Sequence, residues 1–562
     1  MLERIQASIG NLTQATTVFQ RARDIANGGV LLALPALLAN GLLTHSKKRF
    51  FLPKGFYGIQ HLFITLSFIV LLRIKSIEAI QYLSPGELGK VIGSDRVPEI
   101  KTIRRKLGIL AGQSRADLWS SDLSRDWLKS DGGLSGLLYV DGHVRVYHGK
   151  KTKLPKRYVS REKLCLRGMT DYWLNNALGQ PYFVVSTAQN SGILSILRED
   201  IIPRILQELP YKPTREELNK DPDRSVCSII FDREGYSPEF IKQVWDTYRI
   251  SCYTYKKFPG ANWNEDRFQE YNVRLHNGEI VKMKLGEKNT LLGNALMVRE
   301  IRRLSENGHQ TAIITTDRKT KINDVAANMF ARWSQENFFK YMQEHFGIDR
   351  LIEYETTPMD ETTEVVNPEH RRLESSKRSL RQKLGRKLSL FGALTLELSD
   401  TQTKNDESRF QTCLLRKAEM REAIEFYRRQ LETLKKKQQE VEPHIPMSKL
   451  PEHEKFSSLS VEKKHIMDMI KMIVYRAETA MAVIIEPDLT RRKETRALLR
   501  QIFSTEIDLE PDEENQVLNV QLHSMSNERS NKTVTALCEK LNETETVFPG
   551  TNMKIIYKLV SS

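Results

Sequence analysis

The chain has 562 residues, more than a single hydrophobic core can serve, so we expect several domains. Lys and Arg number 86 against 71 Asp and Glu, and the formal net charge of +15 favours a polyanionic partner such as nucleic acid over an acidic small molecule. The five cysteines show neither CxxC nor Cys/His spacing, which argues against a zinc site or a disulfide framework and favours a reducing, cytoplasmic environment.

Two apolar stretches occur near the N-terminus, at 28–43 and 61–76. Both fall short of the roughly twenty residues that a transmembrane helix needs. We therefore predict that they form buried core helices within a helical region over 1–125, and we expect no membrane partner.

Residues 84–108 divide into two short helices around a polar turn at 94–96, and the second helix carries consecutive basic residues. This pattern is typical of a helix-turn-helix that binds DNA. A helical hairpin with a solvated basic face has the same pattern, so the sequence leaves both interpretations open. The basic residues are Arg104, Arg105 and Lys106.

Short β-type runs follow at 137–141, 144–147 and 182–186, and the residues Gly142-His143 between the first two suggest a hairpin. Three antiparallel strands are expected here.

A helix is predicted over 193–209, where Pro203 must either kink it or begin a second helix. A strand over 225–232, a helix over 237–248 and a strand over 250–255 complete an α/β order with a mixed sheet.

A β-prone segment, 256–310, interrupts this sheet region and contains an Asn-Gly hairpin turn at 277–278. The apolar strand at 311–316 follows it. The sequence therefore predicts a core built from two pieces of chain, 130–255 and 311–370, with a β-rich insertion between them.

Residues 371–505 are predicted to form a basic helical region that contains a linker at 441–462, and 506–562 a small α+β segment. An apolar stripe of less than three heptads occurs on one helix, which fits antiparallel packing within the chain better than a dimeric coiled coil, although either is open. The stripe consists of Met420, Ile424, Tyr427, Leu431 and Leu434.

Three carboxylates occupy positions that suit metal-dependent chemistry. Asp141 and Asp232 each close an apolar strand, where a side chain can project beyond the sheet into a crevice. Asp232 has a second interpretation as a helix cap. Glu336 lies on a helix that follows the insertion, one turn after Arg332, and the ordinary alternative there is a surface ion pair.

Two further residues are weaker candidates. His143 shares a strand face with Asp141, but a histidine bonded to backbone in a turn is the more common situation. Asp317 follows the strand at 311–316 and is held in reserve as a rival third carboxylate.

The order of the three carboxylates, on the first strand, on the fourth strand and on a helix after an insertion, resembles the RNase H-like catalytic domain of DDE transposases. In one insertion-sequence group the last carboxylate lies in a signature of Tyr, Arg, Glu and Lys, often with Trp after the Arg. The Tyr position here holds Met329 and the Lys position holds Gln343, with Lys340 nearby. The residues that match the signature in type and spacing are Arg332, Trp333 and Glu336.

The resemblance implies phosphodiester cleavage and strand transfer with two Mg²⁺ ions, for which Mn²⁺ is expected to substitute. Asp141 would bridge the ions, and Asp232 and Glu336 would each complete the ligand shell of one. Arg332 and Lys340 would contact DNA phosphates, and Trp333 would stack on a displaced base.

The expected partners are double-stranded DNA at the terminal inverted repeats of an insertion sequence, the target DNA, and a second copy of the chain in a synaptic complex. The expected location is the cytoplasm, in association with a bacterial nucleoid. Two alternatives stay open: an RNase H-like structure-specific nuclease that cuts without joining, and a degenerate transposase that binds element ends without catalysis.

Overall fold

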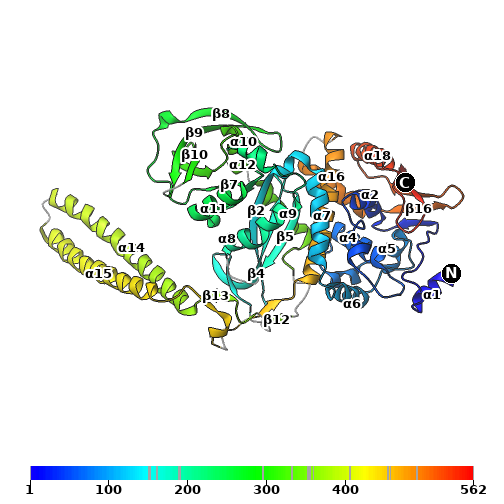
Figure 1. Ribbon diagram of the computed structural model, residues 1–562, viewed down its shortest axis with the longest axis horizontal. Helices are drawn as coiled ribbons and strands as arrows, with labels where there is room; N and C mark the ends of the chain where they lie inside the picture. The colour runs from blue at the N-terminus through cyan, green and yellow to red at the C-terminus, as the bar shows by residue number, and fades with distance from the viewer. Residues whose placement is uncertain are drawn as a thin grey trace.

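A mixed sheet of ten strands forms the centre of the computed structural model, with a helical lobe on one side of it and a long two-helix arm extending from the other (Figure 1). The chain is therefore of the mixed α/β class, as predicted. The structure describes residues 2–149, 154–159, 162–187, 192–293, 296–330, 333–350, 356–358, 360–403, 407–451, 455, 457–488 and 492–560.

The half of the sheet that carries the candidate site has the strand order β5-β4-β2-β6-β7. β5, β4 and β2 pair antiparallel, whereas β2, β6 and β7 pair parallel. A short strand, β3 (Lys156–Val159), also pairs with β4. The bounds are β2 Leu137–Val146, β4 Leu164–Asn175, β5 Pro181–Thr187, β6 Ser228–Ile230 and β7 Ser251–Tyr255.

The hairpin expected at Gly142-His143 is wrong, because β2 runs straight through both residues and its antiparallel partner is β4. The sequence prediction missed β4. Gly142 keeps the strand extended beside Tyr172, and a Cβ added at Gly142 would lie only 3.0 Å from Cε1 of that ring. Asp141 is thus not at the end of its strand; it lies just beyond the part of β2 that pairs with β6.

The segment predicted as an insertion continues the same sheet. β11 pairs antiparallel with β7, and β10, β9 and β8 follow in order. The Asn-Gly turn between β8 and β9 is confirmed: Gly278 has φ 86°, and its N–H donates to Leu275 O at 2.9 Å. The strands are β8 Gln269–Arg274, β9 Ile280–Leu292, β10 Leu296–Leu304 and β11 Gln310–Thr315.

Helices connect the strands and cover the sheet. A π-helical turn (Leu197–Ile201) joins α8 to α9 (Ile202–Glu208) with helical backbone at both junctions, so Pro203 interrupts the regular α-helix and does not start a separate one. Ser237 caps α11, since its hydroxyl accepts from Phe240 N at 3.3 Å. The other bounds are α8 Gly192–Ile196, α11 Pro238–Tyr248, α12 Ile322–Phe330 and α13 Trp333–Tyr341.

The helical lobe contains both apolar stretches, and both are buried as predicted. Among the described helices, none is long and apolar enough to cross a membrane. The segment predicted as a helix-turn-helix forms α5 and α6 with residues 92–99 between them, a longer connection than the predicted turn. The bounds are α2 Leu34–Ala39, α4 Ile59–Leu71, α5 Pro85–Val91, α6 Ile100–Ala111 and α7 Ala116–Ser130.

A C-terminal helix, α16 (Glu462–Ile485), lies between the central sheet and the helical lobe and packs against α2, α4, α6, α7 and β5 (Figure 1). Close by, the N-terminal strand β1 joins a four-stranded sheet otherwise made of C-terminal strands. The two ends of the chain therefore share one core. The bounds are β1 Ala22–Ile25, β16 Ile507–Asp512, β17 Val517–His523, β18 Lys554–Val560, α17 Arg492–Ser504 and α18 Glu528–Asn542.

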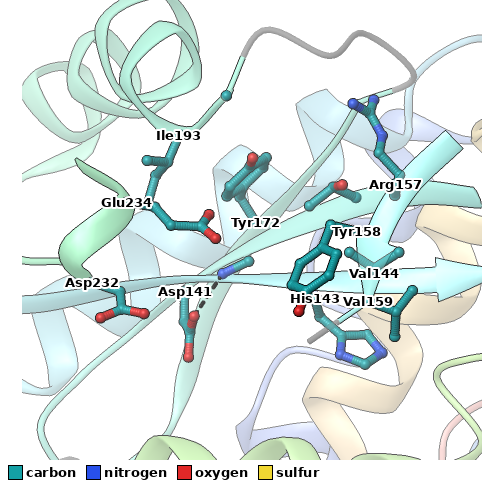
Figure 2. A pocket seen from close by; sticks show the side chains of 13 residues that line it. Asp141, His143, Val144, Arg157, Tyr158, Val159, Tyr172, Ile193, Asp232 and Glu234 are labelled. Atoms are coloured by element: carbon teal, nitrogen blue, oxygen red, sulfur yellow. Dashed lines mark hydrogen bonds between the residues drawn. The ribbon is translucent and has the colours of Figure 1, made fainter. Parts of the chain in front are cut away.

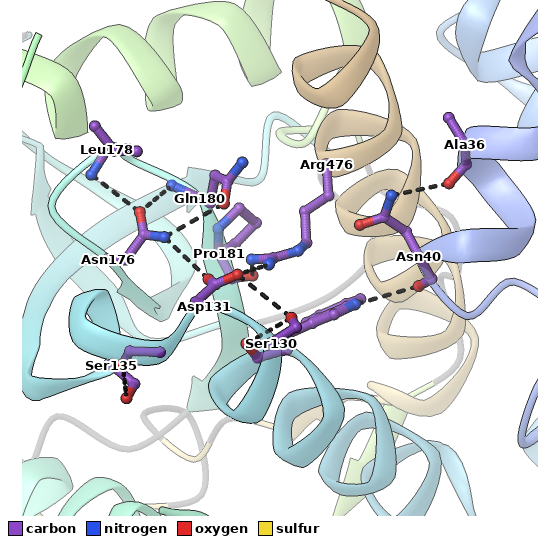
Figure 3. Close-up of polar contacts among 12 residues, drawn as sticks. Ala36, Asn40, Ser130, Asp131, Ser135, Asn176, Leu178, Gln180, Pro181 and Arg476 are labelled. Carbon is purple, nitrogen blue, oxygen red and sulfur yellow. Dashed lines mark hydrogen bonds and ion pairs between the residues drawn. The ribbon is translucent and has the colours of Figure 1, made fainter. Parts of the chain in front are cut away.

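Arg476 in α16 joins three parts of the fold (Figure 3). Its Nη2 donates to Asp131 Oδ1 at 2.8 Å, next to the end of α7, and its Nη1 donates to Pro181 O at 3.3 Å, where β5 begins. Asn176 Nδ2 donates to the other carboxylate oxygen of Asp131 at 3.1 Å. The guanidinium carbon also lies 4.8 Å from the ring centre of Trp127.

The arm is an antiparallel pair of helices, α14 (Pro368–Thr403) and α15 (Glu407–Gln439). Gln438 near the end of α15 donates to Glu374 near the start of α14 at 2.8 Å. Ile424 and Leu431 of the predicted apolar stripe are buried in this pairing. The stripe thus packs within the chain, which was the first of the two interpretations.

We predict that Arg476→Met destabilises the protein by about 3–5 kcal/mol, because it leaves the carboxylate of Asp131 largely buried without its cation. Chemical unfolding followed by far-UV circular dichroism measures this. The matched control is Arg421→Met, which breaks an exposed ion pair with Glu425 at 3.6 Å and should change stability by less than about 0.5 kcal/mol. Equal effects of the two substitutions would contradict the role given to Arg476.

Candidate active site

A pocket of about 340 Å³ opens on the face of the sheet at β2 (Figure 2). Its walls come from β2, β3 and β4, from the start of α8 and from the turn that follows β6. Asp141, Asp232 and Glu234 contribute three carboxylates to the lining, and Arg157 contributes a guanidinium. The pocket is thus polar and brings together residues that are far apart in the sequence.

Asp141 and Asp232 meet in this pocket because of the strand register. Leu137 pairs with Ser228 and Tyr139 with Ile230, so the same register continued by two residues puts the two aspartates level with each other. Asp141 Oδ1 accepts from Gly142 N at 2.9 Å.

Asp232 also has the second role that the sequence left open. Its Oδ1 accepts from Arg233 N at 2.6 Å and caps the short 3₁₀ turn Arg233–Gly235. Capping and pocket lining coexist, since a carboxylate has lone pairs to spare after accepting one bond.

Glu336 lies in α13, and its side chain is outside the described part of the structure, as is that of Trp333; Arg332 lies outside it altogether. Helix α13 is nevertheless held against β2. Phe339, one turn after Glu336, stacks on His143 with ring centres 5.5 Å apart and planes at 23°. Lys340 on the same helix is exposed.

The end of α13 is anchored to the helical lobe. The hydroxyl of Tyr341 donates to Glu478 of α16 and accepts from Arg73 Nη2 at 2.7 Å. Arg73 also donates to Glu478 at 2.9 Å. Contacts at both ends of the segment 339–341 therefore fix the helix that carries Glu336.

His143 is not a turn residue, contrary to the more common situation considered above. Its Nε2 bonds to Asp349, and Gln343 Nε2 lies 3.1 Å from the same ring nitrogen. Gln343 occupies the position of the Lys in the signature, so this departure from the pattern places an amide beside the histidine that lines the pocket.

Buried charges support the strands behind the pocket. Arg145 of β2 forms a two-point ion pair with Asp171 of β4 at 2.5 and 3.1 Å, and Ser186 Oγ donates to Asp171 at 2.6 Å. Burial alone would raise the pKa of Asp171, but the nearby cations Arg145 and Lys464 hold it below the ordinary value.

Next to these charges, Lys471 of α16 donates to Gly347 O at 3.1 Å. Burial lowers the pKa of Lys471 to about 7. The lysine thereby holds the segment that carries Asp349, the partner of His143.

Sequence reasoning missed Glu234, Arg157 and Tyr172. Glu234 stands two residues after Asp232, which is a signal that could have found it. Arg157 is 6 % exposed, and burial lowers its pKa to about 10. Burial raises the pKa of Tyr172, whose ring covers Gly142. No sequence pattern indicated Arg157 or Tyr172, because the strands that carry them, β3 and β4, were not predicted.

The reserve candidate Asp317 does not line the pocket. It accepts from Tyr253 Oη at 2.6 Å and from the backbone N–H groups of Lys319 and Thr320 at 2.8 and 3.0 Å. Burial would raise its pKa, but these hydrogen bonds outweigh burial and lower it. Asp317 is therefore a turn-forming residue.

The three basic residues predicted on α6 point in different directions. Arg104 is exposed and forms an ion pair with Glu78, Arg105 is exposed, and Lys106 is buried. They do not present one basic surface.

Within the described residues, a set with metal-ligand geometry lies elsewhere: one potential ligand atom each from Asp24, Glu506 and His523 lie within 4.8 Å of one another at the C-terminal sheet. The two acidic residues are exposed, and His523 Nε2 already bonds to Asp508 at 3.1 Å. Exposed clusters of this kind are common without an ion, so we assign no function to it.

We predict that His143→Ala loosens α13 from β2, since it removes the stacking on Phe339 and the contacts to Asp349 and Gln343. Amides of α13 should exchange about tenfold faster, equivalent to about 1.4 kcal/mol of lost protection. Hydrogen exchange with mass spectrometry measures this, with Lys340→Ala on the exposed side of the same helix as control. Unchanged exchange in His143→Ala would show that the stacking does not hold the helix.

Comparison with known proteins identifies the family. A family model described as "Transposase protein" matches residues 1–561, nearly the whole chain. No match was found among curated proteins or among solved structures.

Proposed function

The chain belongs to this transposase family, and we propose that it cuts and joins DNA at the ends of an insertion sequence by the metal-dependent DDE mechanism. The observation that carries the proposal is the convergence of Asp141 and Asp232 in one polar pocket on the face of a mixed sheet.

The topology supports an RNase H-like core. β2 is the first strand of the candidate core and β6 is the fourth when the short strand β3 is left aside, and they lie side by side in parallel. After the inserted strands, α13 returns to β2 with Glu336 on it. This is the arrangement that the resemblance to DDE transposases implies.

The donor chemistry of the pocket suits Mg²⁺, which prefers carboxylate oxygens and water. Asp141 and Asp232 would hold the ions, with Glu336 as the third carboxylate. Two bound Mg²⁺ ions supply charge neutralisation at the scissile phosphate and activation of water or a 3′-hydroxyl, and Mn²⁺ is expected to substitute. Glu234, which also lines the pocket, is the rival for the third position.

Several cations would place the DNA. Arg157 lines the wall of the pocket opposite the three carboxylates (Figure 2). Among the Arg and Lys residues that the structure describes, it is the one best placed to contact a phosphate in the pocket. Arg332 and Lys340 would contact the backbone on either side of Glu336, and Trp333 would stack on a displaced base.

A transposase has DNA as its partner, and two element ends must be brought together. We propose that the ends carry terminal inverted repeats and that two copies of the chain pair them in a synaptic complex with target DNA. Action on a bacterial chromosome would place the protein in the cytoplasm at the nucleoid.

The test is strand cleavage of DNA that carries the sequences flanking the gene, with Mg²⁺. We expect nicking at an element end by the wild type, and a loss of about a hundredfold or more in Asp141→Asn, Asp232→Asn and Glu336→Gln, because each removes a metal ligand. DNA binding without Mg²⁺ should be retained. Glu234→Gln should keep most of the activity, as should the exposed control Glu239→Gln on α11.

Other outcomes assign other functions. Loss of cleavage in Glu234→Gln but not in Glu336→Gln would move the third carboxylate to Glu234. Cleavage without strand transfer would indicate a nuclease. Binding without any cleavage by the wild type would indicate an end-binding protein that has lost catalysis.

A further inference from the structure

A second pocket, of about 400 Å³, lies in the helical lobe beside α6. One wall is a single face of α6, because its lining residues follow spacings of three and four. The residues 8–10 and the segment 53–57 form the rest. The contributors from α6 are Thr102, Arg105, Lys106 and Ile109.

Lys106 is the unusual residue in this pocket. The residue is 5 % exposed, but its ammonium group is not among the fully buried polar atoms; the ammonium forms no hydrogen bond or ion pair with another side chain of the described residues. Burial, together with the neighbouring charge of Arg105, lowers its pKa. The stem of the lysine is thus buried while its ammonium keeps contact with solvent, and holding a cation there without a counter-charge costs some free energy.

The rest of the lining has the same sign of charge. Lys54 and Arg105 are exposed at the pocket, and none of its lining residues is acidic. Thr102 adds a hydroxyl to the lining. The ring of Tyr57 adds an apolar surface, and the hydroxyl of Tyr57 donates to Arg96 O at 3.0 Å. Three cations around a cavity without a carboxylate match the charge and donor needs of a phosphate group.

Arg104, the residue before Arg105, differs from the two basic residues that follow it. It is turned to Glu78 and does not line the pocket. A recognition helix that reads DNA with its basic face would need Arg104, Arg105 and Lys106 on one surface, and α6 does not provide this.

We propose that this pocket binds a backbone phosphate of duplex DNA, with Lys106 inside it and Lys54 and Arg105 at its mouth. The assignment rests on the proposed function, since DNA is the polyanion on which a transposase acts. Such a contact carries no base information, and it fixes the duplex on the helical lobe independently of cleavage at the sheet.

The test measures DNA binding and stability of the full-length protein in EDTA, so that no cleavage occurs. Lys106→Met should weaken binding to any duplex about tenfold and lower the slope of log K against log salt by about 0.9, the value for one phosphate contact. The same substitution should raise the unfolding midpoint without DNA, because it replaces a partly desolvated charge that has no counter-charge by an apolar side chain. A lysine with a purely structural role would not give this combination.

Two kinds of control keep the test decisive. Arg104→Gln should leave affinity and slope unchanged. Lys54→Gln and Arg105→Gln change only exposed side chains, and each should lower the slope in the same way even if Lys106→Met does not fold.

Wild-type affinity and slope in the three pocket variants would overturn the proposal, as would wild-type affinity and slope in Lys54→Gln and Arg105→Gln if Lys106→Met does not fold. If millimolar inorganic phosphate, but no duplex, raises the unfolding midpoint of the wild type and not of Lys106→Met, the pocket takes a free anion and the assignment to DNA is wrong. Because binding is measured without Mg²⁺, a failure of the DDE mechanism in the cleavage assay would not change the binding results. A failure of the phosphate-binding proposal would likewise leave the cleavage results unchanged.

Discussion

The parallel pairing of β2 with β6 is the constraint on which the candidate active site depends. It puts Asp141 level with Asp232, although 90 residues separate them in the chain. Side chains alternate across a strand, so a slip of one residue would send one carboxylate to the other face of the sheet. Gly142 allows Tyr172 to lie over β2, which gives the pocket one of its walls. The site is thus built on the sheet, where positions are held more precisely than on loops.

The helix α16 supplies the second constraint. It carries charged residues into the core, and each is engaged: Arg476 with Asp131, Lys471 with the carbonyl of Gly347, and Glu478 with Arg73. These contacts connect α7, the segment after α13 and the helical lobe. Buried ionic contacts add little net stability compared with apolar packing, but losing one partner is costly, so they fix one arrangement of the parts. The elements around the pocket are therefore positioned by a helix far from it in sequence.

Local sequence rules were sufficient for the elements that depend on neighbours in the chain. The apolar runs before Asp141 and Asp232 indicated the two strands, and the local signals at Pro203 and Gly278 indicated a break in a regular helix and a hairpin. β4 was missed because its buried Asp171 reads as a surface residue until its pairing with Arg145 is known, and this partner lies 26 positions away. Lys106 was grouped with Arg104 and Arg105 as one basic set, whereas its burial is set by residues of other segments. The side chain of Glu336 lies outside the described structure, so its place in the pocket stays a prediction.

The most direct measurement is anomalous scattering from crystals of the protein soaked in MnCl₂ and measured at the manganese edge. The account predicts manganese at the pocket, bound by the carboxylates of Asp141 and Asp232, as two ions about 4 Å apart when a third carboxylate completes the set. Manganese only at another place, such as the exposed cluster of Asp24, Glu506 and His523, would contradict it. Asp141 and Asp232 would then have a structural role and would not bind the catalytic metal ions.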